Sequence, residues 1–162
     1  MTFHLDEIDV RLLAELEAYA DRPNVALARL VGLSPAATLN RVRRLKESGV
    51  IRRIAARLDS AAAGFTLQVY VLVTLARHEE AAAKRFTETV RALPHIISAD
   101  EVTGDVDALL MVVARDVADL QDVLVRLSTR GGATRLVTLL RLRELKPSAP
   151  LPLSPGAAVR SR

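Results

Sequence analysis

The residues best suited to chemistry lie in one short stretch, residues 34–45, which reads SPAATLNRVRRL. The amide of Asn40 can pair with the edge of an adenine, and the guanidinium groups of Arg41 and Arg44 can reach guanine or a phosphate. The major groove of duplex DNA admits one helix, so a helix that exposes such side chains is suited to reading DNA. The stretch therefore indicates a DNA-binding element.

Local signals predict that this stretch is a helix with one apolar side. Ser34 is a favoured N-cap, and Pro35 suits the first helical position. Leu39, Val42 and Leu45 recur at a spacing of three residues, so we expect all three to face inward. The polar side of the helix would then face outward, toward nucleic acid.

Basic residues are concentrated on this helix and on the segment after it. Residues 34–57 contain a single acid, Glu47, among seven basic residues: Arg41, Arg43, Arg44, Lys46, Arg52, Arg53 and Arg57. Such clustering is the electrostatic footprint of phosphate contacts, whereas a merely solvated helix face usually mixes the two signs. The candidate DNA-binding residues are Ser34, Ala37, Thr38, Asn40, Arg41, Arg43, Arg44, Arg52, Arg53 and Arg57.

Two further helices are predicted to precede this one and to position it. Apolar residues from Leu5 to Tyr19 keep a helical period, and a second, short helix capped by Asn24 ends at Gly32. Residues 50–58 are predicted to form a strand or a pair of short strands. Residues 1–58 thus have the plan of a winged helix-turn-helix domain, although a three-helix bundle used for protein contacts has the same outline.

After a linker of small residues, 59–65, the pattern changes its period. Strands are predicted at 66–76, 96–102, 108–114 and 134–145, and helices at 79–93 and 117–127. The order β-α-β-β-α-β over residues 66–147 is that of a ferredoxin-like domain, so the whole chain falls in the α+β class. A Pro-rich tail, residues 148–162, follows, and we expect its last ten residues to be mobile.

A ferredoxin-like sheet carries its helices on one face, and its other face is rich in Val and Leu in this chain. The simplest cover for that apolar face is a second copy, so we expect a homodimer formed through the sheets. A dimer would also present two recognition helices to a two-fold DNA site.

Composition disfavours several other classes of protein. The absence of cysteine removes disulfides, thiolate catalysis and Cys-based zinc sites, and it fits a reducing cytoplasm. His4, His78 and His95 lack metal-ligand spacing, and no phosphate loop or paired-carboxylate motif occurs. The longest apolar run is too short to cross a bilayer, and the N-terminus lacks a signal-peptide pattern. We therefore expect a cytoplasmic protein with no catalytic residue, metal, cofactor or membrane partner.

Four segments occur in a distinctive order along the chain. They are Leu5-Asp6-x-x-Asp9, VGLSPAATLNRVRRLKESGVI at 31–51, Val102-Thr103-Gly104-Asp105-x-Asp107, and Arg143-Glu144-Leu145-Lys146 with Pro150-Leu151-Pro152-Leu153. Together they span nearly the whole chain, and the second is highly specific. The chain thereby resembles the Lrp/AsnC (feast/famine) family of bacterial and archaeal transcription regulators.

The resemblance implies sequence-specific binding to double-stranded DNA, homodimers that can assemble into octamers, and control by a small effector, often an amino acid. In such proteins the effector lies between dimers, which points to Gly104, Asp105, Asp107 and Thr138. A glycine lets backbone N–H groups approach a carboxylate, and an aspartate can bind an ammonium. The alternative is that Gly104-Asp105 is only a turn. Leu136 replaces a hydroxyl residue of many members, which favours a more apolar effector or a loss of effector binding.

Two other functions share this architecture. Siroheme decarboxylases resemble it, and Gly49-Val50-Ile51-Arg52-Arg53 echoes their signature, but residues 102–108 lack the His, Tyr and Trp of their catalytic loop. We therefore expect a regulator rather than an enzyme. The other function is that of a DNA-architectural protein without an effector, which the sequence does not separate from an effector-gated regulator.

Overall fold

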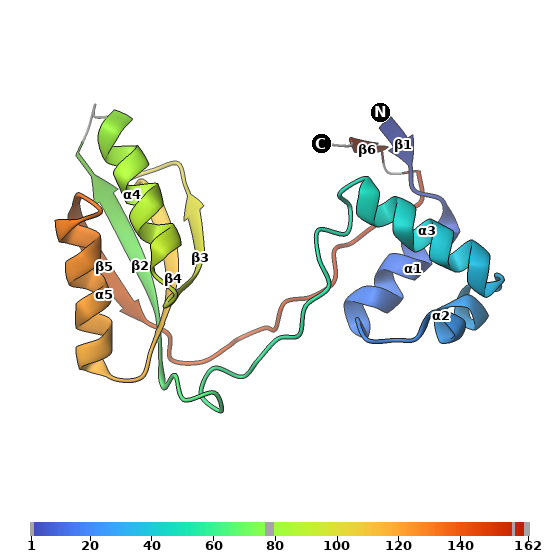
Figure 1. Cartoon of the computed structure of the whole chain (residues 1–162), viewed down its shortest axis with the longest axis horizontal. Coiled ribbons are helices and arrows are strands. Elements are labelled where there is room, and N and C mark those ends of the chain that lie inside the picture. Colours follow the sequence, from blue (N-terminus) through green and yellow to red (C-terminus); the bar gives the residue numbers. More distant parts are fainter. Residues whose placement is uncertain (1, 77–79, 157, 161–162) are drawn as a thin grey trace. The chain divides into compact units, whose positions relative to one another are not determined.

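The computed structural model describes residues 2–76, 80–156 and 158–160, shown as a ribbon in Figure 1. The chain divides into two units, residues 1–57 together with 146–162, and residues 58–145. Each unit has its own apolar core. The sequence grouping of 148–162 as a separate tail thus differs from the structure, in which this segment belongs with the N-terminal unit.

The N-terminal unit is built on three helices, α1 (Glu7–Ala18), α2 (Asn24–Val31) and α3 (Pro35–Glu47). Ser34 caps α3 by accepting a hydrogen bond from the Ala37 N–H at 3.2 Å. Gly32 ends α2 in the left-handed region, with φ of 71°, which a glycine adopts without steric cost. Asn24, which we expected to cap α2, instead donates its side-chain N–H to the Pro35 carbonyl at 2.8 Å.

The inward side of α3 contains two of the three residues that we predicted, Val42 and Leu45. Thr38, Val42 and Leu45 face inward and are buried, whereas Leu39 is 58% exposed. Positions spaced by three residues drift around a helix of 3.6 residues per turn, and the spacing 38–42–45 follows the turn more closely. The inward assignment of Leu39 is therefore wrong, and a threonine takes its place.

The predicted β extension after α3 is also wrong. Residues 50–58, all of them described, contain no strand. The Ile51 N–H closes the turn after α3 by donating to the Leu45 carbonyl at 3.1 Å, and Val50 and Ile51 pack on the core. A strand needs a neighbouring strand for its hydrogen bonds, and this apolar segment is drawn onto the helices instead.

A small sheet joins the two ends of the chain (Figure 1). Strand β1 (Thr2–His4) pairs antiparallel with β6 (Ala158–Arg160), and the Gly156 N–H donates to the Leu5 carbonyl at 2.8 Å. Leu153 packs against the cluster that contains Leu5, Leu13 and Leu45. The described part of the last ten residues is thus held on the helical unit, contrary to the mobility that we expected, because an apolar residue anchors it.

The C-terminal unit contains a four-stranded antiparallel sheet with the order β3-β4-β2-β5. Its elements are β2 (Leu67–Leu75), α4 (Glu80–Ala92), β3 (Ile96–Glu101), β4 (Ala108–Ala114), α5 (Val117–Thr129) and β5 (Ala133–Leu140). This order confirms the ferredoxin-like prediction. Strand β5 ends five residues before the predicted boundary at Leu145, and Glu79, the predicted start of α4, lies outside the described residues.

Both helices, α4 and α5, cover the same face of the sheet (Figure 1). Alternate residues of β2, such as Val69, Val71 and Val73, are buried against these helices together with Leu110 and Val112 of β4. The residues between them point to the other face, which none of the described helices covers.

Candidate functional site

The outward side of α3 carries exposed polar side chains. Opposite the buried Thr38, Val42 and Leu45 lie the exposed residues Ala36, Asn40, Arg43 and Glu47. Nη2 of Arg43 donates to Oδ1 of Asn40 at 3.3 Å, and Nε of Arg43 lies 3.8 Å from the carboxylate of Glu47. Because the Arg43 side chain is 68% exposed, it remains accessible to a ligand of α3.

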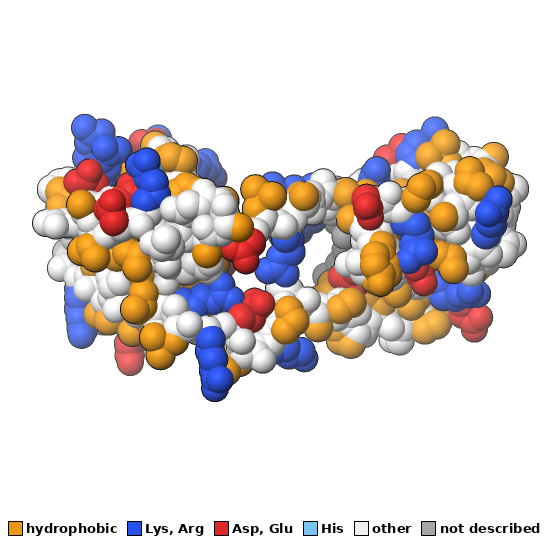
Figure 2. Space-filling view, turned by 90° about the horizontal axis from the view of Figure 1, so that it is seen from below, with side chains coloured by type: hydrophobic (Ala, Val, Ile, Leu, Met, Phe, Trp, Pro, Cys, Tyr) orange, Lys and Arg blue, Asp and Glu red, His pale blue; other side chains and the backbone are white. Residues whose placement is uncertain are grey.

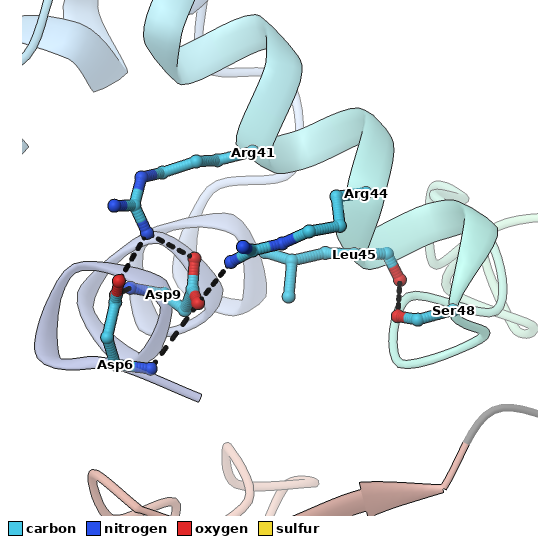
Figure 3. A network of polar contacts seen from close by, with 6 residues as sticks. All are labelled: Asp6, Asp9, Arg41, Arg44, Leu45 and Ser48. Atoms are coloured by element: carbon cyan, nitrogen blue, oxygen red, sulfur yellow. Dashed lines mark hydrogen bonds and ion pairs between the residues drawn. The ribbon is translucent and has the colours of Figure 1, made fainter. Parts of the chain in front are cut away.

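Arg41 and Arg44 point instead toward α1, where two acids meet them (Figure 3). The Asp9 carboxylate is fully buried; its Oδ1 accepts from Arg41 at 2.9 Å and its Oδ2 from Arg44 at 2.5 Å. Oδ2 of Asp6 accepts from the same Arg41 nitrogen at 2.6 Å. These four residues form an ion-pair cluster between α1 and α3 whose formal charges cancel.

The two acids of this cluster also cap α1. The Asp6 carboxylate accepts from the Asp9 N–H at 2.8 Å, and the Asp9 carboxylate accepts from the Asp6 N–H at 3.3 Å, which is a capping box. Desolvation works to raise the pKa of Asp6, but hydrogen bonds from Arg41 and the Asp9 N–H and the nearby cationic charges outweigh it. The pKa of Asp6 therefore lies below its ordinary value. The Asp6 hydrogen bond likewise raises the pKa of Arg41.

The structure separates the ten predicted DNA-binding residues into groups. Asn40, Arg43, Arg52, Arg53 and Arg57 are exposed, Ser34 caps the exposed start of α3, and Ala37 is half-buried. Thr38 is fully buried and its hydroxyl donates to the Ser34 carbonyl at 3.1 Å, so its assignment to DNA is wrong. A small hydroxyl residue in this position fills the core and satisfies its own hydrogen bond within the helix.

The pairing of Asp6 and Asp9 with the arginines of α3 was not predicted from the sequence. Both acids lie at the start of α1, outside the basic stretch 34–57. The sequence does contain a signal for this pairing. Asp6 and Asp9 are three residues apart, and so are Arg41 and Arg44.

In the C-terminal unit, Asp107 ties the turn between β3 and β4 to the end of β2. Its N–H donates to the Val73 carbonyl at 2.8 Å, and its Oδ2 accepts from the Leu75 N–H at 2.7 Å. Gly104 in the same turn has φ of 130°, a conformation that L-residues rarely adopt. Asp105 is exposed in this turn, and Thr138 lies opposite Val71 on β5 and is exposed.

A hollow of about 300 Å³ lies beside Asp107, between α4 and the strands β3 and β4. Leu75, Phe86 and Val90 contribute apolar surface to it, and Arg91, Asp100, Glu101 and Asp107 contribute charged groups. Of the four predicted effector residues, Asp107 lines this hollow, whereas Gly104, Asp105 and Thr138 lie outside its lining. An apolar wall with groups of both signs suits a small zwitterion that has an apolar side chain.

The described part of the chain contains neither a metal-binding cluster nor a membrane-spanning helix. No group of three or more His, Cys, Asp or Glu residues that could hold a metal occurs among the described residues, which do not include His78. Across 2–76, 80–156 and 158–160, no helix has the length and apolar character needed to cross a bilayer.

Comparisons with known proteins agree with this arrangement. Residues 5–46 match the family model described as the AsnC-type helix-turn-helix domain, and residues 68–151 match the Lrp/AsnC ligand binding domain. The leucine-responsive regulatory protein of Rhizobium meliloti is 36% identical, over 88% of this chain and 92% of that protein. The transcriptional regulator AldR of Mycolicibacterium smegmatis is 36% identical, over 91% of this chain and 86% of its own length.

Solved structures show the same likeness over both units. A transcriptional regulator of Neisseria meningitidis, solved as a complex with L-Met, has a TM-score of 0.85 at 30% identity, covering 91% of this chain and 96% of its own. An AsnC family transcriptional regulator of Agrobacterium tumefaciens has a TM-score of 0.83 at 30% identity, covering 91% and 97%. The helix-turn-helix unit, the ferredoxin-like unit and these matches lead to one conclusion: the chain belongs to the Lrp/AsnC family of DNA-binding transcriptional regulators.

Proposed function

We propose that this regulator reads duplex DNA with the outward side of α3. Asn40 and Arg43 are placed to meet base edges, because they are exposed in the middle of the helix and lie opposite its buried side. Ser34 and Ala37 lie at the start of α3, where the helix dipole favours a phosphate. The exposed, polar outward side of α3 is the observation that carries the proposal.

We assign to the segment after α3 the phosphate contacts that flank the base-reading region. Arg52, Arg53 and Arg57 are exposed there on an irregular segment rather than on a wing strand. Cations on such a segment can adjust to the backbone of the duplex and supply affinity that does not depend on sequence. Arg41 and Arg44, which we predicted to contact DNA, are paired with Asp6 and Asp9 and are therefore not included among the proposed DNA contacts.

The open face of the sheet supports a homodimer. Tyr70 and Leu72 of β2, Leu109 and Met111 of β4 and Val137 of β5 are half-buried on this face, and Leu139 is 49% exposed. A contiguous apolar face of this kind on a regulator calls for a partner, and a second copy offers the same surface. Assembly of such dimers into octamers stays a prediction.

The effector that best fits the hollow beside Asp107 is an α-amino acid with an apolar side chain. Arg91 can bind its carboxylate, the acids at the hollow can bind its ammonium, and Leu75, Phe86 and Val90 can contact its side chain. The Neisseria meningitidis regulator was solved with L-Met, and the feast or famine regulatory protein of Mycobacterium tuberculosis was solved with L-methionine. Gly104, Asp105 and Thr138 could contribute if a second dimer completes the site.

Regulation would follow from a difference in effector affinity between two assembly states. An effector that binds at an interface between dimers favours the assembly in which its site is complete, and that assembly fixes the spacing of the α3 helices. No catalytic step is proposed, because residues 102–108 hold no His, Tyr or Trp. The proposed compartment is the cytoplasm, where bacterial DNA is bound.

Selection and calorimetry test this proposal together. Purified protein should enrich a short duplex from a randomised library. In a panel of the twenty amino acids, L-methionine or another apolar amino acid should shift the melting temperature of the protein. A specific duplex without any amino-acid response would favour an effector-independent architectural protein. Release of CO₂ from added siroheme would instead favour a siroheme decarboxylase activity.

A further inference from the structure

The cluster of Asp6, Asp9, Arg41 and Arg44 has a use beyond holding two helices together. We infer that Asp9 is a specificity-determining positioning residue of the DNA-binding unit. It holds Arg41 and Arg44 against α1, so that α3 meets DNA through Asn40 and Arg43. This inference rests on the proposed DNA-contacting side of α3.

Both carboxylate oxygens of Asp9 accept hydrogen bonds from the other residues of this cluster. Its side chain is 0% exposed, its Oδ1 accepts from Arg41 at 2.9 Å, and its Oδ2 accepts from Arg44 at 2.5 Å and from the Asp6 N–H at 3.3 Å. A buried carboxylate that loses its cationic partners is strongly destabilised. The two arginines therefore cannot both turn away to bind phosphates while α1 and α3 stay packed.

The three arginines of α3 differ in the exposure of their side chains. The exposure is lower where the pairing with acids is more extensive. The side chain of Arg41, which pairs with two acids, is 26% exposed, that of Arg44 is 49% exposed, and that of Arg43 is 68% exposed. The partners of Arg43 are themselves exposed: Asn40 accepts its hydrogen bond at 3.3 Å, and the Glu47 carboxylate lies 3.8 Å from its Nε. Arg43 is therefore the arginine of α3 that can approach DNA without breaking a buried ion pair.

The cancelled charges matter for discrimination between DNA sequences. Phosphates attract exposed cations wherever they occur along a duplex, so each added free guanidinium raises the affinity for every sequence. With the charges of Arg41 and Arg44 compensated by Asp6 and Asp9, α3 offers less of this indiscriminate attraction. A larger share of its binding then depends on contacts with base edges.

The test compares Asp9→Asn, Arg44→Gln and Arg43→Gln in the full-length protein. Affinity is measured at several salt concentrations for two duplexes, one selected by the wild-type protein from a randomised library and one with the same bases scrambled. Asp9→Asn should bind the scrambled duplex more tightly with a steeper salt dependence, because it frees a guanidinium. The ratio of selected to scrambled affinity should fall roughly tenfold.

The two arginine variants form a matched pair. Arg43→Gln should lower the affinity for the selected duplex more than the affinity for the scrambled duplex, because it removes a contact with a base edge. Arg44→Gln should leave the slope of log affinity against log salt nearly unchanged, because Asp9 holds its guanidinium. Thermal melts of all variants establish that each is folded; if Asp9→Asn does not fold, the arginine pair decides the question.

Three results would count against the inference or its foundation. A fall of about 0.9 in the salt slope of Arg44→Gln, the value for one phosphate contact, would show that Arg44 binds phosphate, which overturns the role of Asp9 and leaves the proposed face of α3 intact. Parallel losses of both affinities in Asp9→Asn, with the slope unchanged, would show that Asp9 is merely structural. An unchanged slope and affinity in Arg43→Gln would instead contradict the proposed DNA-contacting side itself.

Discussion

The two units of the chain use polar and apolar surface in opposite ways. In the helix-turn-helix unit, Asp9 is buried and pairs with two arginines, so the charges of these arginines are partly compensated. In the ferredoxin-like unit, the buried core is aliphatic, and an apolar sheet face and a charged hollow remain open. Under the proposed function, the first unit limits what it contacts and the second receives an effector and a second copy.

Apolar side chains also remain exposed on the segments that connect the units. Leu58, Leu142 and Leu145 are each at least 80% exposed. Figure 2 shows hydrophobic side chains uncovered on the face that it draws. Isolated exposed aliphatic residues are common on proteins and need no partner. The open face of the sheet differs from them because its residues are contiguous across three strands.

The largest expected effect concerns the open sheet face. Leu139→Arg should convert the proposed homodimer to a monomer, because it places a charge in the middle of the proposed apolar interface. Affinity for a two-fold duplex should then fall about a hundredfold or more through the loss of bivalent binding. Light scattering coupled to gel filtration measures the oligomer, and DNA titration measures the affinity.

Val125→Arg is the matched control for this change. Val125 lies on α5, on the helical side of the sheet, and is 48% exposed, nearly the same as the 49% of Leu139. It should leave the dimer intact. If both variants dissociate, or if neither does, the interface does not lie on the open sheet face.

The next effect concerns the buried charge of the helix-turn-helix unit. Arg41→Met should lower the free energy of unfolding by about 2 to 3 kcal/mol, somewhat less than for a fully buried ion pair, because Asp9 keeps Arg44. Urea denaturation measures this loss. Arg43→Met should change stability by less than about 0.5 kcal/mol, and similar losses in both variants would deny the special position of Arg41.

The third effect concerns amino-acid binding, which we expect to depend on the hollow more than on the turn beside it. Asp107→Asn should weaken binding of an apolar amino acid about tenfold or more, because the group that binds the ammonium loses its charge. Asp105→Asn, outside the hollow, should have a smaller effect, and neither variant should alter basal DNA binding. Calorimetric titration with L-methionine distinguishes them, and a larger loss in Asp105→Asn would move the site to the turn.

The smallest effect is a pH dependence of the helix-turn-helix unit. The pKa of Asp6 is lowered in the folded state from 3.8, so its pairing with Arg41 stabilises the fold above that value. This contribution is lost as the pH falls through the folded-state pKa, and it should stay below about 1 kcal/mol because Asp6 is half exposed. Asp6→Asn should remove it in acid titrations followed by circular dichroism, whereas an unchanged acid response would assign the dependence to other carboxyls.

The order of elements was predictable because it rests on local signals. The strand of Ala108–Ala114 has the predicted bounds, and Ser34 and Pro35 begin α3 as expected. These features depend on side-chain types within one or two turns of the chain. The sheet order follows from connection rules that hold across ferredoxin-like folds.

The features that sequence reasoning missed depend on residues that are distant along the chain. Arg41 meets Asp6 across an interval of 35 residues, and Leu153 packs against the cluster of Leu5, Leu13 and Leu45 from near the other end of the chain. Thr38 was misplaced because a hydroxyl residue was assumed to be exposed, yet its own helix satisfies that hydroxyl. Pairing partners and burial of polar groups are set by tertiary packing, which a periodic pattern does not encode.

The central claim is that Asn40 and Arg43, on the outward side of α3, read the sequence of bound DNA. Sequencing of duplexes selected from a randomised library by the wild-type protein and by Asn40→Ala tests it most directly. The expected result is a loss of preference at one base pair in each half of a two-fold site, with the other positions kept. An unchanged preference at every position would contradict the claim.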